Sequence, residues 1–277
     1  MQICSTNQQI FDLVSAWKVA GKSIAFVPTM GGLHQGHLSL VEQAALKADK
    51  VIVSIFVNPA QFAQHEDFGE YPRDLNKDLT LLEALQVDCV FTPNIEMIYP
   101  EGIKSDVKVG AMGQILCGKT RPHFFDGVVQ VVRRLFDIVK PDMAIFGKKD
   151  CQQLQIIKKF TSKVEIIGAP TVREHDGLAM STRNQYLNKH ERKIAPQLHK
   201  VLLRIEQGEL DLESASKELQ QHFKLDYLQM LDANTLKSVT GNSTQIAILC
   251  AVFLGSNRLI DNIIFNQELY IKVSKQG

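Results

Sequence analysis

Two histidines, His34 and His37, mark the seam between a strand-like and a helix-like stretch in the segment FVPTMGGLHQGHLSLVEQA. The first turn of a helix presents unpaired N–H groups and about half a positive charge, so it attracts anions. Side chains three positions apart share one face of a helix, and imidazoles donate hydrogen bonds to phosphate oxygens. Three glycines in this segment would let a ligand approach the backbone closely. The pattern favours binding of a nucleotide phosphate.

Other roles for this histidine pair have to be weighed. A single histidine at a helix start is more often a cap or a surface residue. A metal site would also use paired histidines, but no third ligand lies at a recognisable spacing, so the metal ligands are unknown from the sequence. The Rossmann GxGxxG and Walker GxxxxGK[ST] patterns are both absent.

Three further polar clusters follow apolar runs. In NPAQF, Gln61 could orient a polar substrate, although a loop glutamine has no function as often as it has one. In FGKKDCQQ, Gly147 permits close backbone approach, Lys148 or Lys149 can neutralise phosphate, and Asp150 can accept from ribose hydroxyls. Taken alone, FGKKDCQQ is slightly better explained as a solvated turn with Asp150 as a helix cap.

The fourth cluster, counting the histidine segment as the first, is VREHDGLAMSTRNQYL, residues 172–187. Its Asp176-Gly177 pair indicates a turn. The residues Ser181, Thr182 and Arg183 then offer two hydroxyls and a guanidinium on a loop that could close over a ligand. Four polar clusters after four apolar runs are harder to explain structurally than any one of them.

The surrounding elements explain why these clusters would meet. Short apolar strands alternate with amphipathic helices, which predicts an α/β chain with a parallel sheet covered on both faces. Ligands of such sheets bind outside the carboxyl ends of the strands. We expect strands at 23–27, 50–57, 88–92, 143–146 and 164–167, and helices at 6–20, 38–47, 74–85, 124–139 and 151–160.

The pattern changes after about Leu187. Two charged amphipathic helices are expected at 189–207 and 212–223, and strands at 225–231 and 246–254. We therefore predict two domains, a nucleotide-binding domain over 1–184 and a smaller α+β domain over 185–277.

Composition is ordinary for a globular protein, with 45% hydrophobic and 22% charged residues among 277. The net charge of +1 provides no general attraction to nucleic acid or membrane. Five scattered cysteines without a CxxC pair argue against a disulfide framework or a zinc site and favour a reducing cytoplasm. We expect no signal peptide and no membrane-spanning segment.

The motifs PTMGGLHQGHLSLV, SIFVNPAQF, EYPRDL, FGKKDCQQL and AMSTRN, in this order and spacing, resemble the pantothenate synthetase family from about residue 22 to residue 190. The HxGH motif alone would indicate only the wider HIGH-type nucleotidyltransferase superfamily, which includes class I aminoacyl-tRNA synthetases. The combination of motifs is much more specific.

The resemblance implies an ATP-dependent ligase. Pantoate attacks ATP to form pantoyl adenylate and release pyrophosphate, and the β-alanine amine then displaces AMP to give pantothenate. The resemblance also implies ATP as a substrate, Mg²⁺ as a cofactor, a homodimer, and a Rossmann-like domain followed by a small lid domain.

The resemblance further implies residue roles. His34 and His37 would contact the phosphates, with His37 as the proton donor, and Gln61 and Gln153 would hold pantoate. Asp78 is a candidate partner for magnesium, although an exposed helix face would explain it equally well. The residues expected to bind ATP are Met30, Gly31, Gly32, Leu33, His34, Gln35, Gly36, His37, Gly147, Lys148, Lys149, Asp150, Val172, Met180, Ser181, Thr182 and Arg183. Those expected to act in catalysis are His37, His34, Lys149, Ser181 and Arg183.

Some positions depart from the family pattern. Gly32 stands for a common alanine, Gln35 for glutamate, Cys151 for tyrosine and Thr182 for serine. In RPHFFDG, residues 121–127, His123 and Phe124 stand where glycine and histidine are expected, so no role is carried onto His123. Arg121 remains a candidate anion contact.

Three other functions are considered beside the ligase. A nucleotidyltransferase would retain the adenylated product, and a catalytically silent nucleotide-binding protein would keep the fold alone. RNA binding is disfavoured by the near-neutral charge and by the lack of an extension as large as an anticodon-binding domain.

Overall fold

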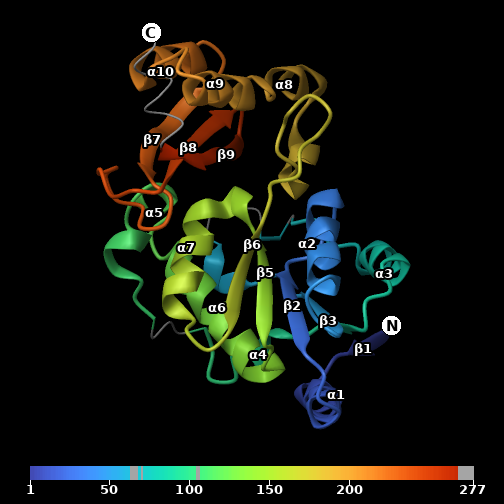
Figure 1. The fold of residues 1–277 in the computed structure, drawn as a ribbon. Helices are drawn as coiled ribbons and strands as arrows, with labels where there is room; N and C mark the ends of the chain where they lie inside the picture. Colours follow the sequence, from blue (N-terminus) through green and yellow to red (C-terminus); the bar gives the residue numbers. More distant parts are fainter. Residues whose placement is uncertain (63–67, 70, 104–106, 268–277) are drawn as a thin grey trace. The chain divides into compact units, whose positions relative to one another are not determined.

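The computed structural model describes residues 1–62, 68–69, 71–103 and 107–267 (Figure 1). The chain forms two compact units, one made of Met1–Lys148 and Ile156–Pro170 and the other of Lys149–Gln155 and Thr171–Gly277. Each unit is built around its own sheet. Among the described residues, no helix combines the length and the apolar character needed to cross a membrane.

The first unit contains a parallel sheet in the order β1-β4-β3-β2-β5-β6, which confirms the α/β prediction. Strand β1 was not predicted, because it is three residues long and only Cys4 in it is buried. It forms through pairing with β4, where Gln2 lies opposite Cys89. The strands are β1 Gln2–Cys4, β2 Ile24–Thr29, β3 Lys50–Ile55, β4 Cys89–Phe91, β5 Met143–Gly147 and β6 Glu165–Ala169.

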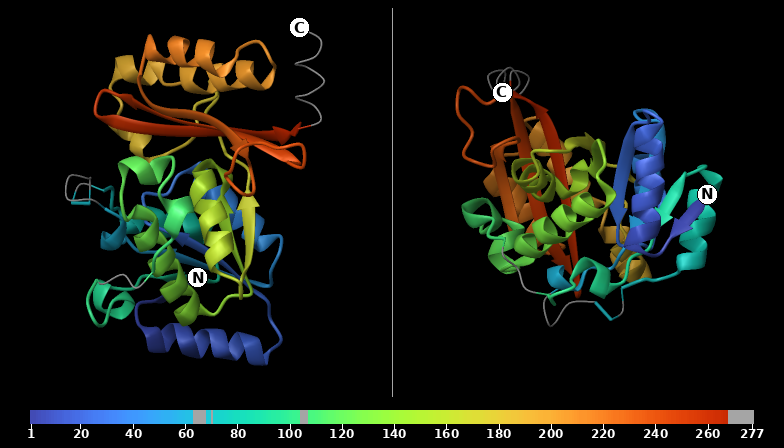
Figure 2. Two further views of the ribbon diagram at one scale, coloured as in Figure 1. Left: turned by 90° about the vertical axis from the view of Figure 1, so that its left-hand side faces the viewer. Right: turned by 90° about the horizontal axis from the view of Figure 1, so that it is seen from below.

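Helices cover this sheet on both faces (Figures 1 and 2). Alternate residues of a strand point to opposite faces. In β2, Ala25 and Val27 belong to the apolar cluster that α2 completes, whereas the Phe26 ring meets Phe136 of α6 at 6.2 Å between centroids. The helices are α1 Asn7–Val19, α2 Gln35–Ala45, α3 Leu75–Ala84, α4 Ile95–Ile98, α5 Cys117–Thr120, α6 Phe124–Val139 and α7 Cys151–Phe160, and the short 3₁₀ turns are η1 Pro59–Gln61, η2 Gly110–Gly113 and η3 Lys148–Asp150.

The strand order fixes where a ligand should bind. From β2 the chain proceeds to β3 and β4 on one side, and then to β5 and β6 on the other. The order therefore reverses between β2 and β5, and ligands of open α/β sheets bind outside the carboxyl ends of the strands at that point. Strand β2 ends at Thr29 and β5 at Gly147, so two of the four polar clusters begin there.

The second unit contains an antiparallel sheet, β7-β8-β9, with helices that share its apolar core. Strand β9 was not predicted, because Asp261 and Asn262 interrupt its apolar pattern although both are buried. The predicted helix 189–207 is two helices, since Pro196 interrupts it. The elements are η4 Thr182–Tyr186, α8 Lys189–Ile194, α9 Gln197–Glu206, α10 Leu212–Gln220, β7 Lys224–Asp232, β8 Gln245–Leu254 and β9 Asn257–Asn266. The functional domains 1–184 and 185–277 remain a prediction.

Helix α6 begins at a strained residue. Its N-cap, His123, has a φ of 66° in the left-handed region, where a side chain costs roughly 1–2 kcal/mol. Glycine, which the family pattern led us to expect at this position, adopts this conformation without that cost. The His123 side chain is 89% exposed and lies only 3.6 Å from Asp126, an ion pair of small value.

We therefore expect His123→Gly to stabilise the protein by about 0.5–1 kcal/mol, after allowing for the greater chain entropy of glycine in the unfolded state. Urea unfolding of the two proteins measures this difference. A lower midpoint for the glycine variant would contradict the assignment of strain to this residue.

Candidate active site

The two histidines form the N-terminal cap of α2. His34 is the N-cap, and its Nδ1 accepts a hydrogen bond from the Gly36 N–H at 3.0 Å. The His37 Nδ1 accepts in return from the His34 N–H at 3.4 Å, which completes a reciprocal capping box. The two rings lie 4.1 Å apart between centroids. The cap explains why α2 begins at Gln35 rather than at the predicted Leu38.

This cap also fixes the chemistry of both rings. A nitrogen that accepts a hydrogen bond carries no proton, so the neutral rings of His34 and His37 hold theirs on Nε2. Both Nε2 atoms are therefore hydrogen-bond donors. Histidine is not a preferred N-cap residue, since Ser, Thr, Asp and Asn cap helices better. The use of histidine at this cap is therefore better explained by the Nε2–H donors it provides than by any gain in helix stability.

Asp78 of α3 holds the loop that leads to this cap. Its Oδ2 accepts from the Gly32 N–H at 2.9 Å and its Oδ1 from the Leu33 N–H at 2.8 Å. The residue is 1% exposed, so the suggestion of an exposed helix face was wrong. Burial raises the pKa of Asp78, although the N–H groups of Leu33 and Gly32 act in the opposite direction. The role of Asp78 in the structure is to shape the loop.

Close packing in this loop requires glycine. Gly31 has a φ of 81°, and a Cβ there would lie 2.9 Å from Asp78 Oδ2 and 3.1 Å from Ile55 Cγ2. The carboxylate thus lies directly against the backbone of the loop. Glycine is required at position 31 by both its conformation and its surroundings.

The second cluster is organised by Asn58, which the sequence did not single out. Asn58 caps the turn η1 by accepting from the Ala60 N–H at 3.2 Å. Its Nδ2 donates to Gln61 Oε1 at 3.1 Å, so the Gln61 amide presents its nitrogen as the donor. That nitrogen lies 2.9 Å from Met30 Sδ, which brings Gln61 beside the end of β2. The main-chain carbonyl of Gln61 accepts a hydrogen bond from the Arg121 guanidinium at 3.3 Å.

Asn58 is itself anchored from two sides. The Tyr99 hydroxyl donates to Asn58 Oδ1 at 2.6 Å, and Asn58 Nδ2 also donates to the Gly127 carbonyl at 3.3 Å. Burial raises the pKa of Tyr99, which keeps this hydroxyl a neutral donor. Gly127 lies so close to η1 that a Cβ would be 2.3 Å from the Ala60 carbonyl oxygen. The position of Gln61 therefore depends on α6 and on Tyr99.

The third cluster follows β5. Gly147 and Lys148 belong to the first unit, whereas Lys149, Asp150 and Gln153 belong to the second. In the second unit, the Lys149 carbonyl accepts from Asn262 Nδ2 at 2.7 Å. Gln153 is half-buried on α7.

The fourth cluster is a short hairpin in the second unit. The Met180 N–H donates to the Val172 carbonyl at 3.0 Å, so two segments expected to bind ATP lie side by side. The turn is at Asp176-Gly177, as predicted, and Arg192 binds Asp176 at 2.5 Å. Ser181 caps η4 by accepting from the Arg183 N–H at 3.3 Å, a bond that leaves its hydroxyl hydrogen for another acceptor. Thr182 is the first residue of η4.

The described residues contain no group of three or more His, Cys, Asp or Glu side chains placed to hold a metal ion. The five cysteines are buried, and none of them forms a disulfide. Burial raises the pKa of Cys250 far above the ordinary range, which makes this thiol a poor nucleophile.

Comparison with known proteins identifies the family of the chain. A family model described as pantoate-beta-alanine ligase matches residues 2–264. The curated pantothenate synthetase of Ruthia magnifica subsp. Calyptogena magnifica is 58% identical over 278 residues, covering 96% of this chain and 100% of that protein.

Two solved structures extend the likeness to the fold. The pantothenate synthetase of Thermus thermophilus is 40% identical with a TM-score of 0.87, covering 98% of this chain and 100% of that one. The pantoate-beta-alanine ligase of Francisella tularensis, complexed with beta-gamma ATP and beta-alanine, is 35% identical with a TM-score of 0.81, covering 97% and 98%. The family model over most of the sequence and the 58% identical relative show that the chain belongs to the pantoate–β-alanine ligase family.

Proposed function

We propose that the chain condenses (R)-pantoate with β-alanine at the expense of ATP, through a pantoyl adenylate. The observation that carries the proposal is the pair of imidazoles capping α2 at the point where the strand order reverses. Both rings hold their protons on Nε2, and the helix end adds a partial positive charge. Membership of the family supports the choice of substrates.

The first step joins two anions. The pantoate carboxylate attacks the α-phosphorus of ATP, the new P–O bond forms, and the bond to pyrophosphate breaks. Donors aimed at the developing phosphoryl charge supply most of the acceleration in such reactions. We assign this role to the Nε2–H groups of His34 and His37. His37 would donate a hydrogen bond to the leaving pyrophosphate, because a neutral ring that accepts at Nδ1 keeps its Nε2 proton.

Residues of the second unit complete the assignment for ATP. Lys149, Ser181 and Arg183 would bind the phosphates, Asp150 the ribose and Val172 the adenine, as the family resemblance implies. The Ser181 hydroxyl retains a proton to donate, because its oxygen is used only as an acceptor within η4. The Val172 carbonyl already accepts from Met180, so an adenine contact there would use its second lone pair.

In the second step the β-alanine amine attacks the activated carbonyl and AMP leaves. Holding amine and adenylate together makes the step effectively unimolecular, and excluding water protects the adenylate from hydrolysis. We propose that residues 185–277 act as a lid for this purpose. No covalent bond to the enzyme forms, so the buried cysteines have no catalytic role.

We propose that Mg²⁺ accompanies ATP. It would neutralise phosphate charge, and it prefers a site made of substrate phosphates, water and one or two carboxylates. The Asp78 carboxylate is engaged by Gly32 and Leu33, so it is a poor candidate for direct ligation.

Pantoate is assigned to Gln61 and Gln153. The Gln61 amide is oriented by Asn58, and its nitrogen lies beside Met30. This orientation suits a hydrogen bond to a pantoate oxygen. The assignment makes the packing of η1 against Gly127 a determinant of pantoate affinity.

Gly127→Ala should therefore raise the KM for pantoate about tenfold and leave the KM for ATP within twofold. The added Cβ would lie 2.3 Å from the Ala60 oxygen, so η1 must move and Gln61 with it. The overpacking should also destabilise the protein by about 2 kcal/mol. Steady-state kinetics with each substrate varied in turn measure the effect. An unchanged KM for pantoate in the folded variant would remove Gln61 from the pantoate site.

We further propose a homodimer in the cytoplasm that does not bind nucleic acid. Five cysteines that form no disulfide suit a reducing compartment, and the net charge of +1 offers no general attraction to polyanions. The family resemblance supports the dimer. Light scattering after size-exclusion chromatography would test it.

The decisive test of function is a product assay with ATP, pantoate and β-alanine in which each is omitted in turn. Pantothenate and AMP should appear only with all three. Pantoate-dependent exchange between ATP and labelled pyrophosphate should proceed without β-alanine. A stable nucleotide-linked product would instead indicate a nucleotidyltransferase, and no reaction at all would refute the proposed function.

A further inference from the structure

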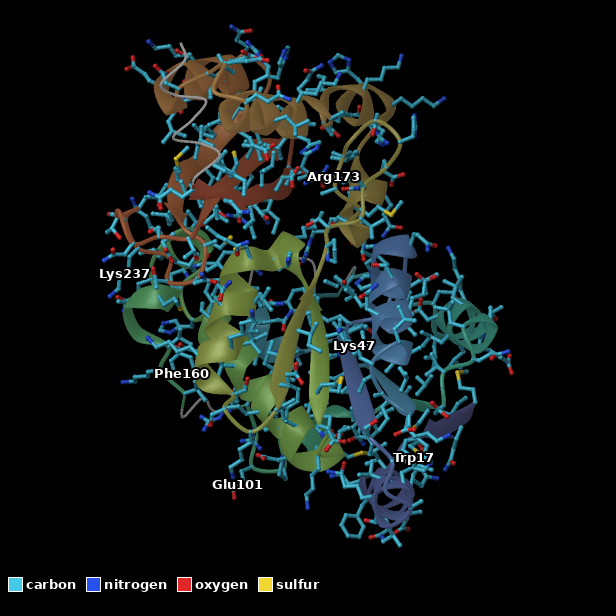
Figure 3. All side chains as sticks on the ribbon, in the orientation of Figure 1. Trp17, Lys47, Glu101, Phe160, Arg173 and Lys237 are labelled. Carbon is cyan, nitrogen blue, oxygen red and sulfur yellow. The ribbon has the colours of Figure 1, made fainter. Side chains whose placement is uncertain are left out.

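A buried ion pair joins strand β9 to the hairpin that carries Val172. Asp261 of β9 is 3% exposed and binds the Arg173 guanidinium through two hydrogen bonds, Nη1 to Oδ2 at 2.7 Å and Nη2 to Oδ1 at 2.9 Å. Arg173 also donates to the carbonyls of Gly177 at 3.1 Å and Asn262 at 3.3 Å. Figure 3 labels Arg173 where the hairpin meets the sheet of this unit. One guanidinium thus closes the hairpin and ties it to β9.

His199 of α9 packs against the same cluster. Its Nδ1 lies 3.4 Å from Asp261 Oδ2, and a Cβ on Gly177 would lie 2.9 Å from its Cδ2. Burial alone would raise the pKa of Asp261, but the neighbouring His199 and Arg173 outweigh it and lower that pKa. The carboxylate is therefore ionised at neutral pH and holds the hairpin through charge as well as hydrogen bonds.

The next residue on β9 holds a second segment. Asn262 is 5% exposed, and its Nδ2 donates to the Lys149 carbonyl at 2.7 Å. Its own N–H donates to Asp261 Oδ1 at 2.7 Å, which couples the two side chains. Adjacent residues of one strand therefore hold the backbone at Lys149 in η3 and the hairpin 172–180.

We propose that Asp261 and Asn262 are positioning residues for ATP, which hold Lys149 and the Val172–Arg183 segment in the arrangement that binds the nucleotide. The inference rests on the proposed function, because those two segments are assigned to ATP there. Neither residue needs to touch the ligand. Their effect passes through Arg173 and through the Lys149 backbone.

The same strand offers a matched control. Arg258 of β9 binds Asp226 of β7 through Nε at 3.0 Å and Nη2 at 2.7 Å, and the two side chains are 17% and 8% exposed. This second buried Arg–Asp pair joins two strands of the same sheet. Neither of its members lies in a segment assigned to ATP. If Asp261 has a purely structural role, its substitution should change the KM for ATP no more than that of Asp226 does.

The experiment compares Asp261→Asn, Asp226→Asn and Asn262→Ala in the full chain by thermal unfolding and by pantoate-dependent ATP–pyrophosphate exchange. Both aspartate variants should lose about 10 °C in Tm, because each leaves a part-buried arginine without its charge partner. Only Asp261→Asn and Asn262→Ala should raise the KM for ATP, by about tenfold, with the KM for pantoate within twofold of wild type.

A wild-type KM for ATP in Asn262→Ala would overturn the proposal for Asn262, and this variant remains informative if Asp261→Asn does not fold. An equal rise in the KM for ATP in Asp226→Asn would show that the effect is general destabilisation. If the wild-type protein shows no ATP–pyrophosphate exchange, the proposed function is refuted, but the positioning role of Asp261 and Asn262 is still open to test. Calorimetric titration with ATP then decides, because weaker binding by Asn262→Ala than by wild type still supports positioning and equal binding refutes it.

Discussion

The double variant His34→Ser, His37→Gln should keep helix α2 intact and lose adenylate formation by more than a thousandfold. The reason for the loss is the removal of both Nε2–H donors, each of which is worth about 100-fold to 1,000-fold if it acts on the developing phosphoryl charge. Pantoate-dependent ATP–pyrophosphate exchange measures the loss directly. The exchange rate of each single variant should fall by about 100-fold or more.

The choice of substitutions separates catalysis from capping. Helix α1 begins with Thr6 as N-cap and Gln9 three residues later, and the two form a capping box like the one that His34 and His37 form on α2. Serine followed by glutamine therefore rebuilds a cap that this chain already uses, and serine caps better than histidine. The Tm of the double variant should lie within about 3 °C of wild type or above it.

An alanine variant of His37 is a weaker test, because it removes the acceptor for the His34 N–H together with the donor. Turnover should still be abolished and the protein should still fold. If the serine and glutamine variants exchange at wild-type rates, the two histidines are merely a cap and the phosphate assignment is wrong.

Local patterns predicted most of the first unit. The bounds of α6 agree with the prediction at both ends, and those of β2, β3 and β5 agree within a few residues, because their apolar runs are continuous and their ends carry turn residues. The polar clusters were found for the same reason, since each follows a clear strand.

Contacts between distant residues could not be predicted in the same way. Asp78 binds Leu33 across 45 residues, and Arg173 binds Asp261 across 88. A buried charge is tolerated only beside its partner, and no local pattern reveals a partner so far away. One signal for Asp78 was present in the sequence, because it lies four residues before Leu82 and seven before Leu85, on the apolar side of its helix.

Asn58 and strand β9 are the other cases. Asn58 precedes a proline and caps a turn, which is a common arrangement, and only its bonds to Gln61 and Gly127 give it a role in the site. Strand β9 contains a charge and an amide at its centre, which in isolation argue for a turn. The two polar residues of β9 fit a buried strand because each has a partner: Asp261 binds Arg173, and Asn262 binds the Lys149 carbonyl.

Asp78→Asn should reduce kcat/KM for ATP by about 100-fold while the Tm changes by only a few degrees. An amide has one acceptor oxygen, so the Gly32 and Leu33 N–H groups cannot both be bound, and the second would face the amide NH₂. The loop must then move, and a displacement of about 1 Å in a positioning segment can cost on the order of 100-fold in rate. Steady-state kinetics with ATP varied measure the loss.

The small change in Tm follows from the sign of the pKa shift. Burial raises the pKa of Asp78 in the folded protein, so ionisation of this group costs stability at every pH above its unfolded value. Removing the charge recovers that cost and offsets the lost hydrogen bond. The carboxylate is therefore kept for the shape of the glycine loop and hence for the position of His34, rather than for stability.

Asp49 provides the matched control, because its carboxylate also accepts from a backbone N–H, that of Ser23 at 2.9 Å. Asp49 lies just before the amino end of β3, whereas ligands of such sheets bind at the carboxyl ends. Its bonds to Ser23 lower its pKa to about 2, so its contribution to stability is fully present above its unfolded pKa and is lost as the pH falls from there through the folded pKa of about 2. Asp49→Asn should lower the Tm at neutral pH and leave the kinetics with ATP unchanged. If Asp78→Asn behaves in the same way, the loop does not depend on this carboxylate, and the link from α3 to the histidine cap is refuted.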